Sequence, residues 1–522
     1  MIFRLNCVIT GEVQTISGNP HRNVQRPDGS SFFLDPAFLF ALENINRENL
    51  KLRLCERFAL TEIEADTIIS TLVKTRLVLE DKSAGKGRSK EAALKRPRVG
   101  ILTERMKLGY GVDLVVHETA SRLTALGYNV KVFTGSIDPL YKGVAYDIIQ
   151  LGDGDRLSDI FSQAFFEKAI KRLAKSQIDV WILESLPFYY WRDSLKGPVI
   201  FVEHGTPFPE LFPKDVSLSV RLARLTKRER VFSVIRSYDR IVAISDFIAS
   251  ELPPSSADRI EIIYNGCDHY RRVCESEARS FRKDLGVADD EVLLLYVGRI
   301  DFDKKKQPYK SVGNLVQVFE RIRTDMPYVR LLLAGRAEPG IEKILVEKGI
   351  IPLLNVSEDK VALALAAADI FVSMSLWEGF DLPLCEAQFQ GKPCVAMRCG
   401  AHPELIDGTG AGVLAENEAE FEQAIRNLAS DRDLVRMMSE KANDNAKRFS
   451  WDSNVQKMQA LIEEVNAAFA YGETASPVKP VGNLRFSLML AGEVLRNEGV
   501  AAFSRLALNK LRRIIARGRS TG

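Results

Sequence analysis

Two glutamates separated by seven residues, Glu378 and Glu386, form the most specific chemical pattern in the sequence. A short apolar run, residues 369–372, precedes them, and a second run, residues 394–397, follows them. Both runs predict buried parallel strands, joined by a loop and by a helix that begins at Glu386. Because ligands of open α/β sheets bind outside the carboxyl ends of the strands, we expect both carboxylates at a binding site.

The loop after the first of these strands combines carboxylates with backbone amides. Glu378 would stand at the strand exit, and Glu386 could accept hydrogen bonds from a ribose diol. Amides at a helix N-terminus attract anions, so the groups together suit a ligand that carries hydroxyls and phosphate. The alternative interpretation is an ordinary loop with two surface glutamates. The candidate ligand-binding residues are Glu378, Gly379, Phe380, Asp381, Leu382 and Glu386.

Positive charge follows another predicted strand, residues 292–297. Arg299 comes directly after this strand and a glycine, and Lys304 and Lys305 follow within one loop. A guanidinium and an ammonium group stabilise the charge that grows on a leaving diphosphate without a metal ion. We expect Arg299 and one of these two lysines, which the sequence does not distinguish, to act in this way. The alternative is a solvated basic loop, which is the interpretation we favour for Lys306.

His204 follows a predicted strand, residues 199–202, and we expect it to point toward the same site. An imidazole titrates near neutral pH, so it is a plausible general base, while the alternative is a structural histidine at a strand end. Gly109 and Gly111 form a glycine-rich turn that would let the backbone approach a phosphate or an acceptor closely. The turn lacks the full glycine pattern of dinucleotide-binding proteins, so dinucleotide binding is weakly supported.

The string around the two glutamates is far more specific than their spacing alone. It reads Ser375-Leu-Trp-Glu-Gly-Phe-Asp-Leu-Pro, and Gly391-Lys-Pro-Cys-Val-Ala and Gly400-Ala-His-Pro-Glu follow it. This combination resembles the C-terminal motif of the retaining GT-B glycosyltransferases of family four, which use nucleotide-sugar donors. Ser245-Asp-Phe-Ile, together with Asn265-Gly-Cys-Asp, is similar to the segment near the hinge of that family. The resemblance covers residues 98–470 and implies an α/β fold of two Rossmann-like domains that face a cleft.

The resemblance also implies roles for the candidate residues. Glu378 would hold sugar hydroxyls, Glu386 the ribose, and Arg299 with Lys304 or Lys305 the diphosphate. His204 would contact the transferred sugar or orient the acceptor. The catalytic residues implied are therefore Glu378, Arg299 and His204.

Asp381 and two aspartate pairs need separate interpretation. Asp381 stands where most members of the resembling family carry glycine, so it would contact a donor hydroxyl or change which sugar is tolerated. Asp301 with Asp303, and Asp153 with Asp155, match the metal-binding pattern of glycosyltransferases with the other major fold. Three lysines adjoin the first pair, which is a poor place for a divalent cation. We therefore expect no metal and no cofactor.

The chain outside the resemblance predicts three further segments. Residues 1–82 predict a small α+β, winged-helix-like accessory domain. Its pattern is a hairpin at residues 25–34, three helices and a closing strand at residues 77–79, and it loosely resembles PqqD-type peptide-recognition domains. An oligomerisation or packing module is the alternative, and acidic residues at the start of the third helix argue against DNA binding. Residues 83–97 predict a linker, and residues 471–522 a basic amphipathic tail that would lie on an anionic membrane surface or pack on its own body.

The predicted boundaries within the main body follow from the strand and helix patterns. We expect an acceptor domain at residues 98–280, a donor domain at residues 281–456, and a helix returning to the first domain at residues 457–470.

Composition is consistent with a peripheral or free cytoplasmic enzyme. The chain has 522 residues, a net charge of +3, and seven cysteines without a disulfide or zinc spacing. It has no apolar run of transmembrane length and no signal-peptide pattern. We expect a cytoplasmic location, either free or on the inner face of the plasma membrane.

The function we expect is metal-independent transfer of a hexose, with retention, to an acceptor hydroxyl in bacterial polysaccharide or glycoconjugate synthesis. The acceptor would be a lipid-linked glycan or a peptide or protein. The alternatives are a nucleotide-sugar epimerase of the same fold and a non-catalytic, peptide-binding scaffold.

Overall fold

The computed structural model describes residues 96–152 except Lys142, 163–205, 231–302 and 308–470, together with five strands among the first 80 residues. The chain divides into two compact units, Met1–Lys95 and Arg96–Gly522, which we treat separately. The main body lies in the second unit.

The first unit contains two small antiparallel sheets. β2 (Val8–Ile16) pairs with β3 (Asn19–Gln25), and β3 pairs with β4 (Ser31–Leu34). Gln25 stands opposite Ser31, so strands flank the turn predicted within residues 25–34. β1 (Phe3–Leu5) pairs with β5 (Val78–Glu80), close to the predicted closing strand. The three predicted helices lie outside the described residues, and the winged-helix-like interpretation stays a prediction.

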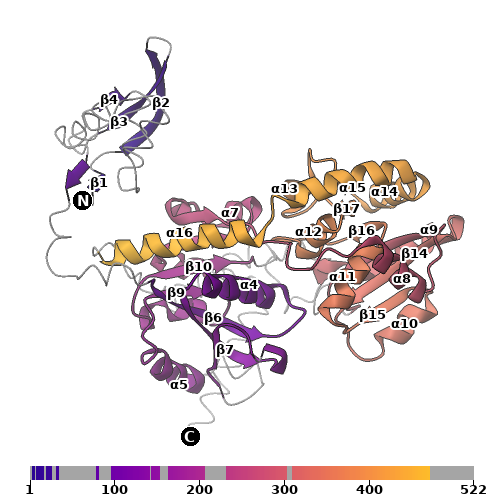
Figure 1. The fold of residues 1–522 in the computed structure, drawn as a ribbon, viewed down its shortest axis with the longest axis horizontal. Coiled ribbons are helices and arrows are strands. Elements are labelled where there is room, and N and C mark those ends of the chain that lie inside the picture. The colour runs from indigo at the N-terminus through magenta and orange to yellow at the C-terminus, as the bar shows by residue number, and fades with distance from the viewer. Residues whose placement is uncertain are drawn as a thin grey trace, which may run out of the picture. The chain divides into compact units, whose positions relative to one another are not determined.

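The second unit begins with a seven-stranded sheet in which every neighbouring pair is parallel (Figure 1). The strand order is β12-β11-β10-β9-β6-β7-β8. The strands are β6 (Arg98–Met106), β7 (Asn129–Ile137), β8 (Asp147–Gln150), β9 (Val180–Leu183), β10 (Val199–Glu203), β11 (Arg240–Ala243) and β12 (Ile260–Ile262). The helices are α4 (Gly111–Ala125), α5 (Gln163–Leu173) and α7 (Asp246–Glu251). A parallel sheet covered by helices is buried on both faces, which explains the continuous apolar runs of its central strands.

A six-stranded parallel sheet follows, with the order β15-β14-β13-β16-β17-β18. The strands are β13 (Val292–Val297), β14 (Val329–Gly335), β15 (Ile351–Leu354), β16 (Ile370–Ser373), β17 (Cys394–Met397) and β18 (Gly412–Ala415). The helices are α8 (Glu275–Asp284), α9 (Val312–Asp325), α10 (Ile341–Glu347), α11 (Glu358–Ala367), α12 (Leu382–Phe389), α13 (His402–Ile406), α14 (Glu418–Ser430) and α15 (Arg432–Ala446). The two parallel sheets confirm the predicted pair of Rossmann-like folds.

Two helix boundaries differ from the prediction. α12 begins at Leu382 rather than at Glu386, because Pro383 lies in its first turn, where a missing backbone N–H costs nothing. Glu386 therefore lies one turn into the helix. The final helix, α16 (Trp451–Ala470), begins at Trp451 rather than at residue 457.

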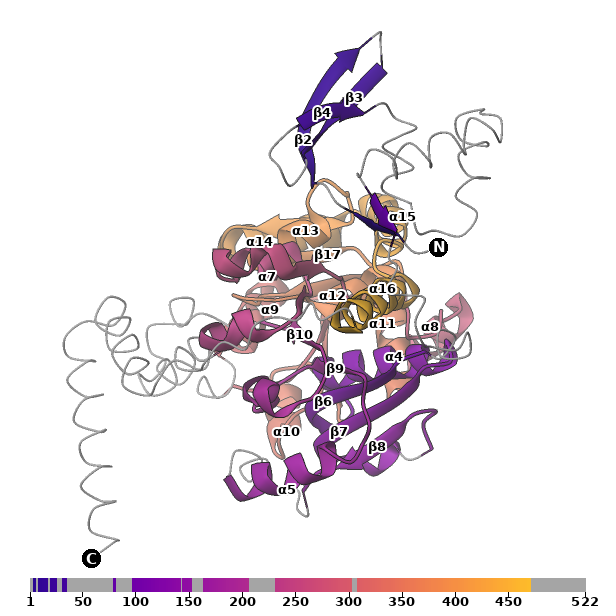
Figure 2. The same ribbon diagram turned by 90° about the vertical axis from the view of Figure 1, so that its left-hand side faces the viewer.

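α16 returns from the second sheet to the first, as Figure 1 shows lengthwise and Figure 2 nearly end-on. It lies along α4, where Tyr128 Oη donates to Glu463 Oε1 at 2.6 Å and Arg122 pairs with Asp452. None of the helices in the described part of the chain is long and apolar enough to cross a membrane.

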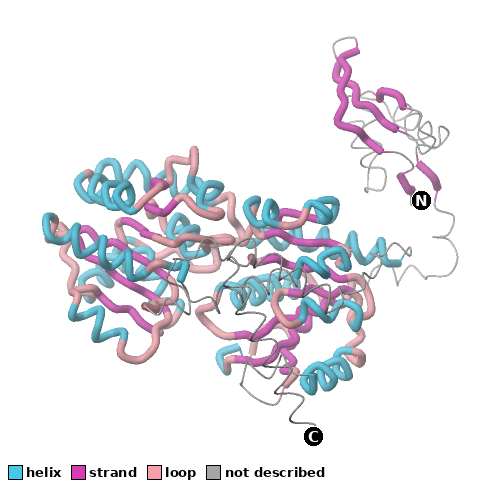
Figure 3. The backbone as a smooth tube through the Cα atoms, turned by 180° about the vertical axis from the view of Figure 1, so that it is seen from behind, coloured by secondary structure: helices cyan, strands magenta, loops and turns pink. Residues whose placement is uncertain are grey.

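The two sheets of the second unit lie side by side in the backbone trace (Figure 3). Aromatic side chains pack where they adjoin. The ring centroids of Tyr264, Phe380 and Phe449 lie 5.5–6.2 Å from one another. Tyr264 follows β12 of the first sheet, whereas Phe380 follows β16 of the second sheet and Phe449 lies between α15 and α16. This contact holds the carboxyl ends of the two sheets near each other.

Candidate active site

The loop at residues 374–381, which we call the Glu378 loop, connects β16 to α12. Glu378 is only 5% exposed, and its carbonyl oxygen accepts a hydrogen bond from Ala401 N at 2.9 Å. A Cβ on Gly400 would stand 2.1 Å from that same oxygen, and Gly400 has a φ of +51°. Only glycine therefore lets the chain before α13 approach closely enough to fix Glu378.

Lys310 is the cation that contacts Glu378. Lys310 ends a short helical turn, Pro308–Lys310, that precedes α9. Its Nζ lies 2.6 Å from Glu378 Oε1. Burial raises the pKa of Glu378, and Lys310 opposes that rise. Burial disfavours the charged ammonium, but Glu378 and Asp381 outweigh it and raise the pKa of Lys310. The sequence interpretation missed Lys310; the available signal was a lysine directly before an amphipathic helix.

Asp381 is held by a histidine from α13. Its Oδ2 lies 3.0 Å from His402 Nε2 and 3.1 Å from Ser373 Oγ. His402 Nδ1 lies 2.7 Å from the carbonyl oxygen of Met397, which can only accept. Burial alone would raise the pKa of Asp381, but the hydrogen bond and charge of His402 lower it. Burial alone would also lower the pKa of His402, but Cys399 and Asp381 raise it well above its usual value, which makes His402 an imidazolium.

Glu386 is 4% exposed and lies on α12. Burial raises its pKa to about 8, with smaller contributions from Asp381 and Glu358. Its Oε1 lies 3.4 Å from Nε2 of His269, another residue that the sequence interpretation did not single out.

His204 pairs with a buried carboxylate of the first sheet. His204 Nε2 lies 2.7 Å from Oε2 of Glu184, which directly follows β9. A Cβ on Gly379 would lie 2.7 Å from the carbonyl oxygen of His204, so the strand end at β10 contacts the Glu378 loop. The structure thus brings His204 next to this loop. Glu184 was missed because it is distant in sequence and carries no local pattern.

Three arginines surround the ring of Tyr110 in the glycine-rich turn. Their guanidinium carbons lie 4.2 Å (Arg105), 5.0 Å (Arg336) and 5.6 Å (Arg299) from the ring centroid. Arg105 comes from β6, whereas Arg299 and Arg336 follow β13 and β14. Arg105 is also 3.3 Å from Asp113, and burial raises the pKa of that carboxyl to about 7.

Both predicted glycines of this turn lie against the second sheet. Gly109 has a φ of +75°, and a Cβ there would meet Arg336 Nε at 2.7 Å. A Cβ on Gly111 would be 3.4 Å from Leu382 Cδ1. The turn therefore joins Arg299 and the Glu378 loop in one region. Lys304 and Lys305 lie outside the described residues.

The described residues, 96–470 with their gaps, contain no group of three or more His, Cys, Asp or Glu side chains that could hold a metal ion. Asp153, Asp155 and Asp303 lie outside them. The region contains buried carboxylates, which can bind hydroxyl groups. It also contains guanidinium and ammonium groups, which can bind phosphate.

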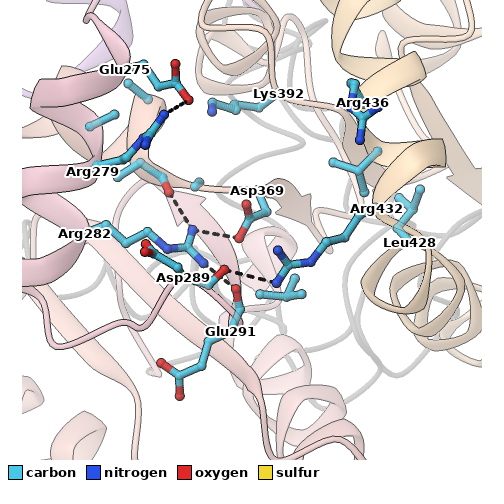
Figure 4. Close-up of a pocket in the computed structure, with 16 residues that line it drawn as sticks. Glu275, Arg279, Arg282, Asp289, Glu291, Asp369, Lys392, Leu428, Arg432 and Arg436 are labelled. Carbon is cyan, nitrogen blue, oxygen red and sulfur yellow. Dashed lines mark hydrogen bonds and ion pairs between the residues drawn. The ribbon is translucent and has the colours of Figure 1, made fainter.

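A cavity of about 610 Å³ opens at the opposite, amino end of the second sheet (Figure 4). Val292, at the start of β13, and Asp369, before β16, line it. Several of its charged groups are paired locally: Arg282 Nη1 donates to Asp369 Oδ2 at 2.8 Å, and Arg279 pairs with Glu275. The length of β16 separates this cavity from the Glu378 loop, so it is not part of the same site.

Two parallel Rossmann-like sheets with such residues at their carboxyl ends define a GT-B glycosyltransferase. Residues 110–271 match the family described as Glycosyltransferase Family 4, and residues 291–431 match the one described as Glycosyl transferases group 1. The chain belongs to this family of retaining glycosyltransferases, which transfer a sugar from a nucleotide sugar.

Individual relatives agree with this assignment. A D-inositol 3-phosphate glycosyltransferase of Corynebacterium kroppenstedtii is 24% identical over 396 residues, which are 68% of this chain and 85% of the relative. Among solved structures, the sucrose-phosphate synthase of Thermosynechococcus elongatus has a TM-score of 0.60 at 20% identity, over 72% of this chain and 100% of that one. Anabaena HepE in complex with UDP-glucose has a TM-score of 0.58 at 17% identity, over 71% and 100%. These structural likenesses concern the fold.

Proposed function

We propose that this enzyme transfers a hexose from a nucleoside diphosphate sugar to an acceptor hydroxyl without a metal ion. One observation carries the proposal: two carboxylates at the carboxyl end of β16 are each paired with a cation, Glu378 with Lys310 and Asp381 with His402. Burying charges is costly unless they are paired. A site that keeps two such pairs largely buried fits a ligand rich in hydroxyls and phosphate.

Each carboxylate has a role in this proposal. Glu378 and Asp381 each use one oxygen for the internal pairs, through Oε1 and Oδ2 respectively. Their other oxygens would accept hydrogen bonds from hydroxyls of the transferred sugar, and Glu386 would accept them from the ribose. The amides of Gly379, Phe380 and Asp381 would support the same ligand.

The diphosphate would be bound by Arg299 and a lysine. Charge grows on the leaving diphosphate as the glycosidic bond breaks, and fixed cations stabilise that charge most in the transition state. Lys310 joins Lys304 and Lys305 as a candidate, because it is already held beside Glu378.

His204 would act on the sugar or the acceptor. If Glu184 accepts the Nε2 proton of a neutral imidazole, Nδ1 keeps a lone pair for a substrate hydroxyl. Glu184 then orients His204 in the tautomer that can accept.

The first substrates to try follow from the named relatives. UDP-glucose is the donor bound in the HepE structure, and D-inositol 3-phosphate is named in the curated relatives. A lipid-linked glycan is the acceptor we favour otherwise, because the basic and apolar residues of 484–522 suit an anionic membrane surface.

Replacing Arg299 tests the proposal. Arg299→Ala should lower the turnover number on the order of a hundredfold, because the lost contact strengthens in the transition state. Arg398→Ala, which removes an exposed arginine paired with Asp407, is the matched control and should leave turnover unchanged. Wild-type activity should persist in excess EDTA. Equal kinetics for Arg299→Ala and wild type, or loss of activity on chelation that manganese restores, would contradict the proposal.

A further inference from the structure

The chain crosses between the two sheets of the second unit twice, and the two connecting segments are hydrogen-bonded to each other. Residues 264–271 lead from the first sheet to the second, and residues 449–451 lead back. Cys267 N donates to the carbonyl oxygen of Phe449 at 3.0 Å, and Trp451 N donates to Asp268 Oδ1 at 2.8 Å. A Cβ on Gly266 would lie 2.4 Å from Trp451 N, so the contact requires glycine.

His269 lies in the first crossing, directly after these contacts. Its side chain is 3% exposed, and Trp451 Nε1 lies 3.3 Å from its Nδ1. An indole N–H can only donate, so Nδ1 must accept. In a neutral imidazole the proton then resides on Nε2. Burial, with Arg122 and His117 of α4, lowers the pKa of His269 to about 4, so the ring is neutral at pH 7.

The Nε2–H of His269 has no hydrogen-bond partner among the described residues. Its nearest carboxylate oxygen is Glu386 Oε1, at 3.4 Å. Leaving a buried donor without a partner costs about 1–3 kcal/mol, so this arrangement is stable only if something compensates it. A movement of about half an ångström would bring the two atoms to hydrogen-bonding distance.

We propose that His269 is the positioning residue for Glu386: it donates Nε2–H to the carboxylate when the donor ribose is bound, and so links the nucleotide site to the crossing. The inference rests on the proposed role of Glu386 in donor binding. The charges around Glu386 are consistent with this inference, because Asp381 and Glu358 both disfavour ionisation of its carboxyl group. Among the described residues, His269 is the only basic side chain within 4 Å of that carboxyl group. A neutral N–H donor favours the ionised acceptor without adding a second buried charge.

A double-mutant cycle tests the link. His269→Phe keeps a buried ring and removes the donor, so the donor KM should rise about tenfold while kcat changes little. In a Glu386→Gln background the same substitution should change the donor KM less than about twofold. In a plot of donor KM against pH, the transition caused by ionisation of Glu386 should also move to higher pH. The reason is that the ionised carboxylate of Glu386 has lost the hydrogen bond from His269.

The matched control is His117→Phe, which removes a half-buried imidazole bonded to Tyr146 at 2.9 Å. Burial is the main cause of the low pKa of His269, so its ring stays neutral without the smaller repulsion from His117. His117→Phe should leave the donor KM and its pH profile as in the wild type. A His269→Phe enzyme with wild-type donor KM and pH profile, or one with an undiminished effect in the Glu386→Gln background, would overturn the inference. Sugar transfer by the wild type tests the proposed function separately. If the wild type is active but the double-mutant cycle shows no coupling between His269 and Glu386, only the inference about His269 fails.

A measurement on the wild-type chain does not depend on the stability of any variant. In protein labelled with ¹⁵N-histidine, His269 should show the neutral Nε2–H tautomer, and its Nε2 resonance should shift on saturation with UDP. A protonated Nδ1, or an Nε2 resonance that stays in place when UDP binds, would refute the proposal.

Discussion

At the scale of residues, the site consists of charges that are stable only in pairs. Lys310 and Glu378 are both largely buried, so neither can be removed without leaving the other uncompensated. The same holds for Asp381 and His402, whose side chains are 5% and 0% exposed. The protonation states of these groups therefore depend on one another, and pH is a direct test of the arrangement.

Lys310→Met should destabilise the fold by about 3–5 kcal/mol at neutral pH, because it leaves Glu378 buried without a cation. The pKa of Glu378 would rise further above its unfolded value. The folded state then binds the proton more tightly, so the loss is smallest at acidic pH and grows as pH rises toward the folded pKa. Urea unfolding at pH 5 and pH 8 measures this difference.

Lys348→Met is the matched control, since it breaks a half-exposed pair with Glu320 at 2.8 Å. It should cost less than about 1 kcal/mol at either pH. If Lys310→Met lowers the free energy of unfolding by the same amount at pH 5 and pH 8, the charge pairing is contradicted.

Glu386 should release a proton when the nucleotide binds. Its pKa of about 8 means that it is mostly protonated at pH 7 in the empty site. Hydrogen bonds from a ribose diol favour the ionised carboxylate and lower that pKa. Calorimetric titration with UDP in buffers of different ionisation enthalpy should therefore show proton release at pH 7. Glu386→Gln should abolish it. A wild-type heat that does not vary with the buffer, or the same proton release from Glu386→Gln, would argue against this role.

At the scale of elements, the glycine-rich turn shows how one backbone conformation positions several side chains. Gly109 adopts a positive φ and lies against Arg336, while the next residue, Tyr110, holds three guanidinium groups around its ring. A side chain at position 109 would strain the turn and displace Arg336. The turn thus connects the first sheet with the arginines that follow β13 and β14.

Gly109→Ala should lower kcat/KM about tenfold, since both the backbone and Arg336 must shift. Gly286→Ala provides the control, because Gly286 has a similar φ of +71° but no atom within 4 Å of the added Cβ. Both variants should lose about 1 kcal/mol of stability from backbone strain, and only Gly109→Ala should lose activity. Equal kinetic effects would mean that the contact with Arg336 is irrelevant.

The elements that could be predicted are those with a strong local pattern. β13 and β17 have the predicted bounds because each is a continuous apolar run. β8 and β12 were not predicted; each lies at an edge of its sheet and is short and partly exposed. The pattern of such edge strands is too weak to distinguish them from loops.

The site divides in the same way. Glu378, Glu386 and Asp381 belong to one local string, so the sequence could single them out. Their partners come from elsewhere: Lys310 is 68 residues from Glu378, and His402 is 21 residues from Asp381. Such pairs arise only when the strands are arranged in a sheet, and no spacing rule in a single sequence predicts them.

At the scale of the whole molecule, the two sheets of the main body act through shared contacts. Ser245 Oγ donates to the carbonyl oxygen of Gly379 at 2.6 Å, and Glu404 accepts hydrogen bonds from the amides of Asp246 and Phe247 at 2.9 and 3.0 Å. The N-terminus of α7 is therefore bonded to α13 and to the Glu378 loop. In the proposed mechanism the first sheet contributes His204 and the second the donor-binding residues, so transfer would require both.

The basic tail supplies a prediction for the complete chain. If residues 484–522 bind an anionic surface, each lysine or arginine near the membrane contributes about 1 kcal/mol. The full-length protein should sediment with anionic liposomes at low salt and less at high salt, while a chain ending at Ala470 should stay in the supernatant. If neither protein sediments, a peptide or protein acceptor becomes the better hypothesis. The resemblance of residues 1–82 to peptide-recognition domains would then be the best indication of the acceptor.

The most direct test of the central claim is the release of nucleoside diphosphate, followed by ³¹P NMR, from a panel of UDP-, GDP-, ADP- and TDP-sugars. We predict that the wild type releases it from at least one donor when D-inositol 3-phosphate or a lipid-linked glycan is present. Glu378→Gln, which keeps the shape of the side chain and removes its charge, should lower that rate on the order of a hundredfold. Release from no donor, or equal release by wild type and Glu378→Gln, would contradict the account.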